Sequence, residues 1–225
     1  MESPIDKGTY RTRVYARLRE RIIAGELLPG ETVTLRGLAA ELGVSVAPVR
    51  EALAQLESEK VILRRDNRDY RVNTLSRGQF EEIFRIRRML EPYLADRACR
   101  RRPDSAVREA ARILEAMRDA RDGAKRFIAL NHDLHFLVYS YAESQILLEI
   151  VSGLWARIGP YLTINLRNQD IGQTLDIHAS MLAFFERKDP KGFNGALLAD
   201  MRFSYAYVAP LLVDEGSAEA GDVPS

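Results

Sequence analysis

The sequence predicts a mainly α-helical protein in two parts, in which three helices and a small β-hairpin precede an all-helical bundle. In the first third of the 225 residues, apolar positions recur at helical spacing and then give way to two short β-prone runs. After that point the apolar spacing is helical throughout, and proline, glycine or polar residues separate the segments. A chain of this length can bury a hydrophobic core in each part.

The N-terminal part is expected to run helix, helix, tight turn, helix and hairpin. Helices are predicted over residues 10–25, 35–42 and 46–59, and short strands over residues 61–63 and 70–72. The polar segment between the two strands would form the turn of the hairpin. This order is that of a winged helix-turn-helix, in which the hairpin is the wing.

Residues at the predicted helix ends support this assignment. Thr34 and Ser45 stand where the second and third helices begin, and both residue types are suited to cap a first turn. Gly43 stands between these helices, where a helix-turn-helix often turns on glycine. In such a fold, the N-terminal residues of the third helix enter the major groove of DNA.

Five residues are candidates for contacts with double-stranded DNA. Ser45, Val46 and Arg50 open the third helix, where they would face base edges. Arg36 opens the preceding helix and is placed to contact the phosphate backbone, and Arg68 lies in the predicted wing. The same pattern fits an ordinary helical subdomain with surface arginines. The pattern by itself therefore favours DNA binding and a purely structural role equally.

The C-terminal part is expected to be a bundle of six helices. They are predicted over residues 79–101, 104–121, 124–142, 145–168, 173–187 and 190–210. Gly159 and Pro160 predict that the fourth of them is kinked or split. We divide the chain into a winged helix-turn-helix domain over 1–76, a helical effector-binding and dimerisation domain over 77–214, and a disordered polar tail over 215–225.

Composition narrows the functional classes. The net charge is only +1, so a polycationic tail is excluded as the means of binding nucleic acid. A single cysteine, Cys99, excludes a disulfide within the chain. No apolar run approaches the roughly 20 residues that span a bilayer, and the N-terminus lacks the pattern of a signal peptide. We therefore expect a cytoplasmic protein with no membrane partner.

Residues 14–72 resemble the DNA-binding domain of the GntR family of transcriptional regulators. The stretches GELLPGE, LAAELGVS and PVREALAQLE are the most specific parts of the resemblance. It implies a homodimeric repressor that binds operator DNA, with DNA-contacting arginines at Arg36 and Arg50. The sequence departs from the family at Val46, where an arginine is usual, and at Asp69, where the wing tip usually has glycine.

The C-terminal part resembles the FCD effector domain of the FadR subgroup of that family. The stretches FEEIFRIRRMLEPYLADRA, LNHDLHFLVYSYAESQILLEI and IHASMLAFFERKDPKGFNGALLADM carry the resemblance. Many such domains hold a divalent metal through one aspartate and three histidines. The matching positions here are Asn131, His135, His178 and Asp200, so two of the four residue types differ from the usual set. Two imidazoles and two oxygens are a donor set that suits zinc, nickel or manganese. The resemblance implies a small organic acid as effector.

Other interpretations of these residues remain open. His135 and His178 are also explained as buried histidines that are hydrogen-bonded to neighbours, and His132 lies off the family register. Arg87 matches the arginine of the family's RxxLE motif and is the candidate effector contact, although its spacing from Glu91 fits a simple salt bridge better. We expect four aromatic residues to be core or dimer contacts rather than a ligand cage: Phe136, Tyr139, Trp155 and Tyr161.

The leading functional hypothesis is a ligand-responsive transcriptional repressor that performs no catalysis. The alternative is a metal-dependent enzyme with a helical active site at His135, His178 and Asp200. No further carboxylate or histidine stands out in the sequence as a general base for such an enzyme. A third possibility is an architectural DNA-binding protein whose second domain only dimerises.

Overall fold

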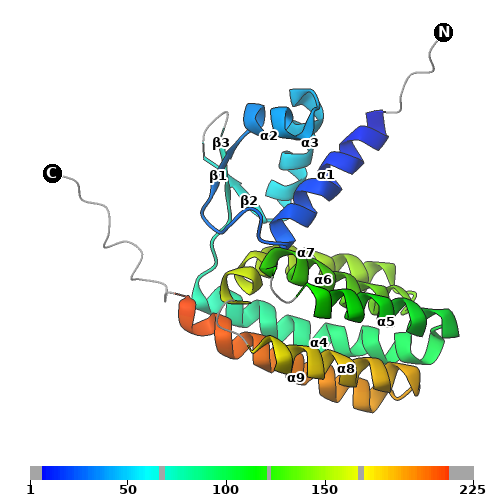
Figure 1. The fold of residues 1–225 in the computed structure, drawn as a ribbon. Helices are drawn as coiled ribbons and strands as arrows, with labels where there is room; N and C mark the ends of the chain where they lie inside the picture. Colours follow the sequence, from blue (N-terminus) through cyan, green and yellow to red (C-terminus); the bar gives the residue numbers. More distant parts are fainter. Residues whose placement is uncertain (1–6, 66–68, 121–122, 167–169, 213–225) are drawn as a thin grey trace, which may run out of the picture.

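A computed structural model describes residues 7–65, 69–120, 123–166 and 170–212. A small domain of helices and strands sits on a larger bundle of helices (Figure 1). In the small domain, the helices are α1 (Lys7–Ile23), α2 (Leu35–Leu42) and α3 (Val46–Ser58). The predicted fold class is confirmed, and the helix ends differ from their predicted positions by no more than three residues.

The small domain has its own hydrophobic core between α1 and α3. Leu18 and Ile22 of α1 face Leu53 and Leu56 of α3, and all four side chains are almost completely buried. Residues four or three apart lie on one face of a helix, so each helix presents a continuous apolar stripe. This core holds α3 against the long α1 and fixes the angle at which α3 is displayed.

The turn between α2 and α3 has the predicted residues at its two ends. Thr34 caps α2, because its hydroxyl oxygen accepts a hydrogen bond from the backbone nitrogen of Gly37 at 3.0 Å. Gly43 ends the same helix in the left-handed conformation, with φ of 64°, which favours glycine. Ser45 occupies the N-cap position of α3 but makes no capping hydrogen bond with its side chain.

The wing contains one strand more than the sequence predicted. The sheet is antiparallel with the order β1-β3-β2, where β1 is Thr32–Thr34, β2 is Ile62–Arg64 and β3 is Asp69–Val72. The hairpin of β2 and β3 is confirmed to within one residue. The added strand β1 pairs Val33 with Tyr70. The sequence predicted β2 from its place in a hairpin with β3, whereas β1 is distant in sequence from its partner β3 and has no such local signal.

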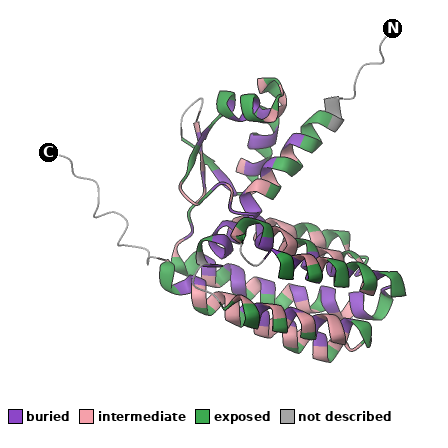
Figure 2. Ribbon diagram, viewed as in Figure 1, coloured by how far each residue is buried: buried purple, intermediate pink, exposed green. Residues whose placement is uncertain are grey.

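The helical bundle contains six helices among the residues that the structure describes. They are α4 (Arg77–Arg101), α5 (Asp104–Asp119), α6 (Ala124–Ser140), α7 (Gln145–Asn165), α8 (Ile171–Glu186) and α9 (Pro190–Val208), followed by a short 3-10 helix at Ala209–Leu211. Helix α4 runs through the middle of the bundle, with α9 on one side and α6 and α7 on the other (Figure 1). The buried residues follow the inward faces of these helices (Figure 2). No described helix has the length and apolarity that a membrane span requires.

Helix α7 belongs to both parts of the molecule. It is a single helix through Pro160, so the predicted split does not occur. Gly159 is needed because α1 comes close: a Cβ at this position would lie 2.7 Å from the carbonyl oxygen of Ile23. One turn later, the Thr163 hydroxyl donates to the carbonyl of Ala24 at 3.1 Å. Ala156, on the same face, is buried in the core of the small domain.

Candidate functional site

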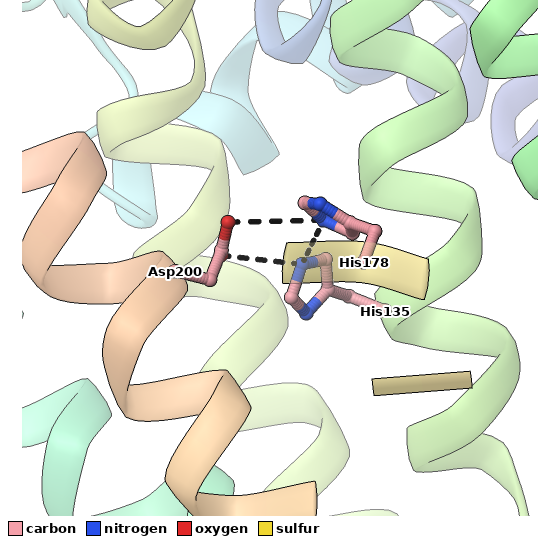
Figure 3. Close-up of side chains that lie close together, drawn as sticks. All are labelled: His135, His178 and Asp200. Carbon is pink, nitrogen blue, oxygen red and sulfur yellow. Dashed lines mark hydrogen bonds and ion pairs between the residues drawn. The ribbon is translucent and has the colours of Figure 1, made fainter. Parts of the chain in front are cut away.

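Three buried side chains from three helices of the bundle converge on one point (Figure 3). They are His135 of α6, His178 of α8 and Asp200 of α9. The two Nε2 atoms lie 3.2 Å apart, and the Asp200 carboxylate oxygens lie 3.5 Å from Nε2 of His135 and 3.8 Å from Nε2 of His178. Both imidazoles are fully buried. We call these three residues the His–His–Asp cluster.

The protonation of His178 is fixed by its backbone neighbour. Its Nδ1 lies 2.7 Å from the carbonyl oxygen of Thr174, one turn earlier on α8. A carbonyl oxygen only accepts hydrogen bonds, so Nδ1 carries the proton. In the neutral ring, Nε2 then has a free lone pair, and this lone pair points toward the other members of the cluster.

A chain of two hydrogen bonds fixes His135 in the same way. The Tyr139 hydroxyl donates its proton to Oε2 of Glu91 at 2.6 Å, and burial raises the pKa of this phenol well above its usual value. The Tyr139 oxygen must therefore accept from Nδ1 of His135, which lies 3.2 Å away. His135 also presents an unprotonated Nε2 to the cluster.

The cluster thus brings together two imidazole Nε2 atoms and one carboxyl group. Burial lowers the pKa of His135 well below its usual range, so the ring stays neutral, and burial raises the pKa of the Asp200 carboxyl. Two nitrogen donors and a carboxylate, with each imidazole oriented by a hydrogen bond to its other nitrogen, are the chemistry of a divalent metal site. Asn131, one turn before His135, is also buried on this face of α6.

A second buried network lies directly beside the cluster and is centred on Glu91. Its carboxylate accepts hydrogen bonds from Nε of Arg87 at 2.5 Å, from Nε1 of Trp155 at 3.0 Å and from Tyr139. The Arg87 guanidinium lies 4.3 Å from the centre of the Trp155 ring. The salt bridge that the sequence favoured is present, but it is buried. The effector contact of Arg87 stays a prediction.

The structure separates His132 from the cluster, as expected from its register. Its ring stacks on Phe136, with 4.2 Å between ring centroids, and meets the edge of Trp155. Tyr139 and Trp155 are core residues as expected, but they also hold Glu91, a role that sequence reasoning missed. The four-residue spacing of His135 and Tyr139 was the available signal for one of these contacts.

Four of the five predicted DNA-binding residues lie in the described part of the small domain. Arg36 and Arg50 are exposed, and neither makes a salt bridge with any residue in the described ranges. The Ser45 side chain is also exposed, whereas Val46 is half-buried and packs against the core of the small domain. Arg68 lies outside the described residues. These assignments remain predictions.

Comparisons with known proteins match both parts of the chain. A family model of the FCD domain matches residues 82–203, and a model of bacterial regulatory proteins of the gntR family matches residues 10–72. The HTH-type transcriptional regulator McbR of Escherichia coli is 27% identical over 84% of this chain and 88% of that protein. The gluconate operon transcriptional repressor of Bacillus licheniformis is 35% identical over 52% of this chain and 48% of that protein.

Solved structures give the same picture of the fold. The structure of E. coli McbR/YncC matches with a TM-score of 0.84 and 25% identity, covering 94% of this chain and 99% of that chain. A transcriptional regulator of the GntR family from Pseudomonas syringae pv. tomato matches with a TM-score of 0.53 and 25% identity, covering 99% and 92% of the two chains. The likeness therefore extends over both the small domain and the bundle.

Proposed function

Because the chain belongs to the GntR family of bacterial regulatory proteins and carries an FCD domain, we propose that it is a homodimeric repressor controlled by a metal-linked effector. As a regulator of this family it binds operator DNA in response to a small molecule. The finer assignment depends on the His–His–Asp cluster, which lies buried in the effector domain. We also propose a cytoplasmic location and a domain boundary between Ser76 and Arg77.

The donor set of the cluster supports a divalent metal. His135, His178 and Asp200 would hold the ion, and Asn131 would add a neutral oxygen. Zinc, nickel and manganese all accept imidazole and oxygen ligands. A bound cation would supply a positive centre that attracts the carboxylate of an organic acid. The charge of Arg87 acts to lower the pKa of His135 and, against the larger effect of burial, that of Asp200, which supports the proposal that Arg87 is a second cation for the carboxylate of the effector.

Helix α7 supports a route from the effector domain to the DNA-binding domain. Trp155 faces inward, where its ring lies 5.1 Å from that of His135 and its nitrogen binds Glu91. The next residue, Ala156, is buried in the core of the small domain. An effector that displaces Trp155 would therefore move the part of α7 against which α1 packs. Coupling between such sites typically amounts to about 1–3 kcal/mol.

Exposed apolar side chains support the homodimer. Met89 and Tyr93 on α4 are 67% and 53% exposed, and Ile146 and Ile150 on α7 are 75% and 47% exposed. Helices α4 and α7 pack against each other, and we propose that these four side chains contribute to one interface with a second copy of the chain. A symmetric dimer would pair two recognition helices over two half-sites of operator DNA.

The environment of Glu91 argues against the enzyme alternative. Glu91 is the carboxylate beside the cluster that could serve as a general base, but three donors already bind it. Both oxygens of this carboxylate are therefore occupied by donors and are not free to accept a proton from a water molecule. We therefore propose that the cluster binds ligands without catalysis.

Selection of binding sites from a random DNA pool tests the proposed function. We expect the full-length protein to enrich a sequence of two inverted half-sites, because a symmetric dimer imposes its two-fold symmetry on the operator. Fluorescence anisotropy on the enriched sequence, with and without chelator, then measures the contribution of metal. Failure to enrich any sequence would reject operator binding. If the affinity of the protein for the enriched sequence changes neither on metal removal nor in His178→Ala, metal-linked control would be rejected.

A further inference from the structure

A hollow of about 370 Å³ lies between α4 and α9, outside the His–His–Asp cluster. Helix α4 supplies Phe84, Arg85 and Arg88, and helix α9 supplies Arg202 and Tyr205. We call this hollow the α4–α9 groove. Its volume is within the range of sites that bind small molecules.

The groove carries an excess of positive charge. Arg85, Arg88 and Arg202 are exposed, and none of them forms a salt bridge or hydrogen bond with a residue in the ranges that the structure describes. Among the lining residues that the structure describes, the one carboxylate is that of Glu81, which accepts from the Tyr205 hydroxyl at 3.0 Å and from Arg77 at 3.2 Å. The hydrogen bond from Tyr205 and then that from Arg77 lower the pKa of Glu81, so this carboxylate is already ionised and engaged.

Aromatic and apolar side chains form the floor of the groove. Phe84 and Met201 line it and are 4% and 1% exposed, so they are firmly packed. The Tyr205 ring stands edge-on to Phe84, with 5.5 Å between centroids, and forms one wall. A floor of this kind suits the apolar or aromatic body of a ligand, while the arginines suit an anionic group.

The groove and the surface that we assign to the dimer share helix α4. An α-helix turns by about 100° per residue, so Met89 lies roughly 40° around α4 from Arg85 and roughly 100° from Arg88. Both helices of the groove also approach the cluster. Arg87 lies behind Phe84, with 5.2 Å between its guanidinium and that ring, and Asp200 immediately precedes Met201.

From these observations we infer that the α4–α9 groove is a second ligand site, which binds a small organic anion with an aromatic or apolar body. The anionic group, a carboxylate or a phosphate monoester, binds Arg85, Arg88 and Arg202, and the body of the ligand packs against Phe84 and Tyr205. The ligand joins α4 to α9, the helix that positions Asp200, so occupancy of the groove alters the cluster without entering it.

Binding of small fluorinated probes tests this site on the full-length protein. Fluorine NMR titrations use 4-fluorophenylacetate, 4-fluorophenyl phosphate and the uncharged 4-fluorobenzyl alcohol. We expect saturable binding of at least one anion and none of the alcohol. The double variant Arg88→Gln/Arg202→Gln should weaken binding of that anion at least tenfold. The matched control is Arg112→Gln, which removes an exposed arginine on α5 and should change nothing.

Three results would overturn the second site. One is the absence of saturable binding for both anions, and another is unchanged affinity in the double variant. The third is loss of binding in His178→Ala with retention in the double variant, because the probe would then occupy the cluster. That third result would leave the proposed function intact, so the two proposals fail separately. Circular dichroism of each variant checks that it is folded.

Discussion

Arg36 and Arg50 of the small domain differ from Arg87 of the bundle in exposure and in partners. Arg36 and Arg50 of the small domain are exposed and form no salt bridge with a described residue, so their charges are available to a partner. Arg87 of the bundle is 2% exposed and is held by Glu91 and by the face of Trp155. The first kind of arginine contributes to binding, whereas the second contributes to stability and to the shape of a ligand site. Substitutions in the two regions should therefore separate these effects.

The largest expected effect is on stability, at the buried pair. Arg87→Met leaves the Glu91 carboxylate buried without its cation, which should lower the free energy of unfolding by about 3–5 kcal/mol. Urea denaturation followed by circular dichroism measures this loss. Arg50→Met is the matched control and should change stability by less than about 0.5 kcal/mol, as is usual at the surface. A loss below about 1 kcal/mol for Arg87→Met would show that Glu91 is protonated or solvated.

The next effect is on operator affinity, at the recognition helix. Arg50→Ala should weaken binding to the specific operator by about 1–3 kcal/mol, the usual contribution of a good base contact. Arg36→Ala should instead weaken binding to all sequences alike and reduce the salt dependence, because a phosphate contact releases counterions. Fluorescence anisotropy at several salt concentrations distinguishes the two. Unchanged operator affinity in Arg50→Ala would refute the assignment of α3 as the recognition helix.

A smaller effect is expected where Tyr139 orients His135. Tyr139→Phe removes the acceptor of the Nδ1 proton, so affinity for the divalent metal should fall about tenfold while the ligands remain. Isothermal titration of metal-free protein gives this affinity. Tyr141→Phe is the control, since that hydroxyl follows the end of α6 and donates to Glu109 of α5 at 3.4 Å, on the exposed surface. Equal affinities in the wild type and Tyr139→Phe would mean that the hydrogen-bond chain does not position His135.

The smallest effect is a pH dependence of the metal-free protein. The pKa of His135 is lowered on folding, so the unfolded chain binds more protons once the pH falls below about 6.5, the ordinary histidine value. Protonation of His135 does not affect the free energy of unfolding above that pH. Below it, this free energy falls by at most about 1.4 kcal/mol per pH unit. The pKa of Asp200 is raised on folding, so the contribution of this group to stability decreases as the pH rises above about 3.9.

A comparison of the wild type with His135→Gln isolates the histidine contribution. Urea denaturation of the two metal-free proteins between pH 5 and pH 8 gives the difference in stability, in which the Asp200 contribution largely cancels. As the pH falls below about 6.5, the wild type should lose stability relative to the variant. A difference that is constant with pH would show that His135 has an ordinary pKa in the folded protein.

Local patterns predicted most of the fold because each element depends on its own residues. The caps at Thr34 and Gly43 and the apolar stripes of α1 and α3 are properties of short segments. Strand β1 was missed because it is short and pairs with β3, which is distant from it in the sequence. Gly159 and Pro160 indicated a break in the helix. Instead, the glycine leaves room for α1 to pack closely against α7, which no local pattern in the sequence predicts.

The functional site was predictable only in part. Resemblance to the FCD domain indicated His135, His178 and Asp200, and the structure brings all three together. The network around Glu91 was not predictable, because its bonds to Tyr139 and Trp155 join residues 48 and 64 positions apart. Tertiary packing decides which helices of a bundle are in contact, and the sequence of one helix does not identify the helices that pack against it.

The metal content of the purified protein tests most directly whether the His–His–Asp cluster is a metal site. Protein without a His tag is loaded with zinc, nickel or manganese in turn, dialysed, and measured by elemental analysis. His132→Ala is the matched control, because it removes a histidine of α6 that lies outside the cluster. We predict one ion per chain for at least one metal in the wild type and in His132→Ala, and almost none in His178→Ala. A stoichiometry near zero for all three metals in the wild type would contradict the metal site.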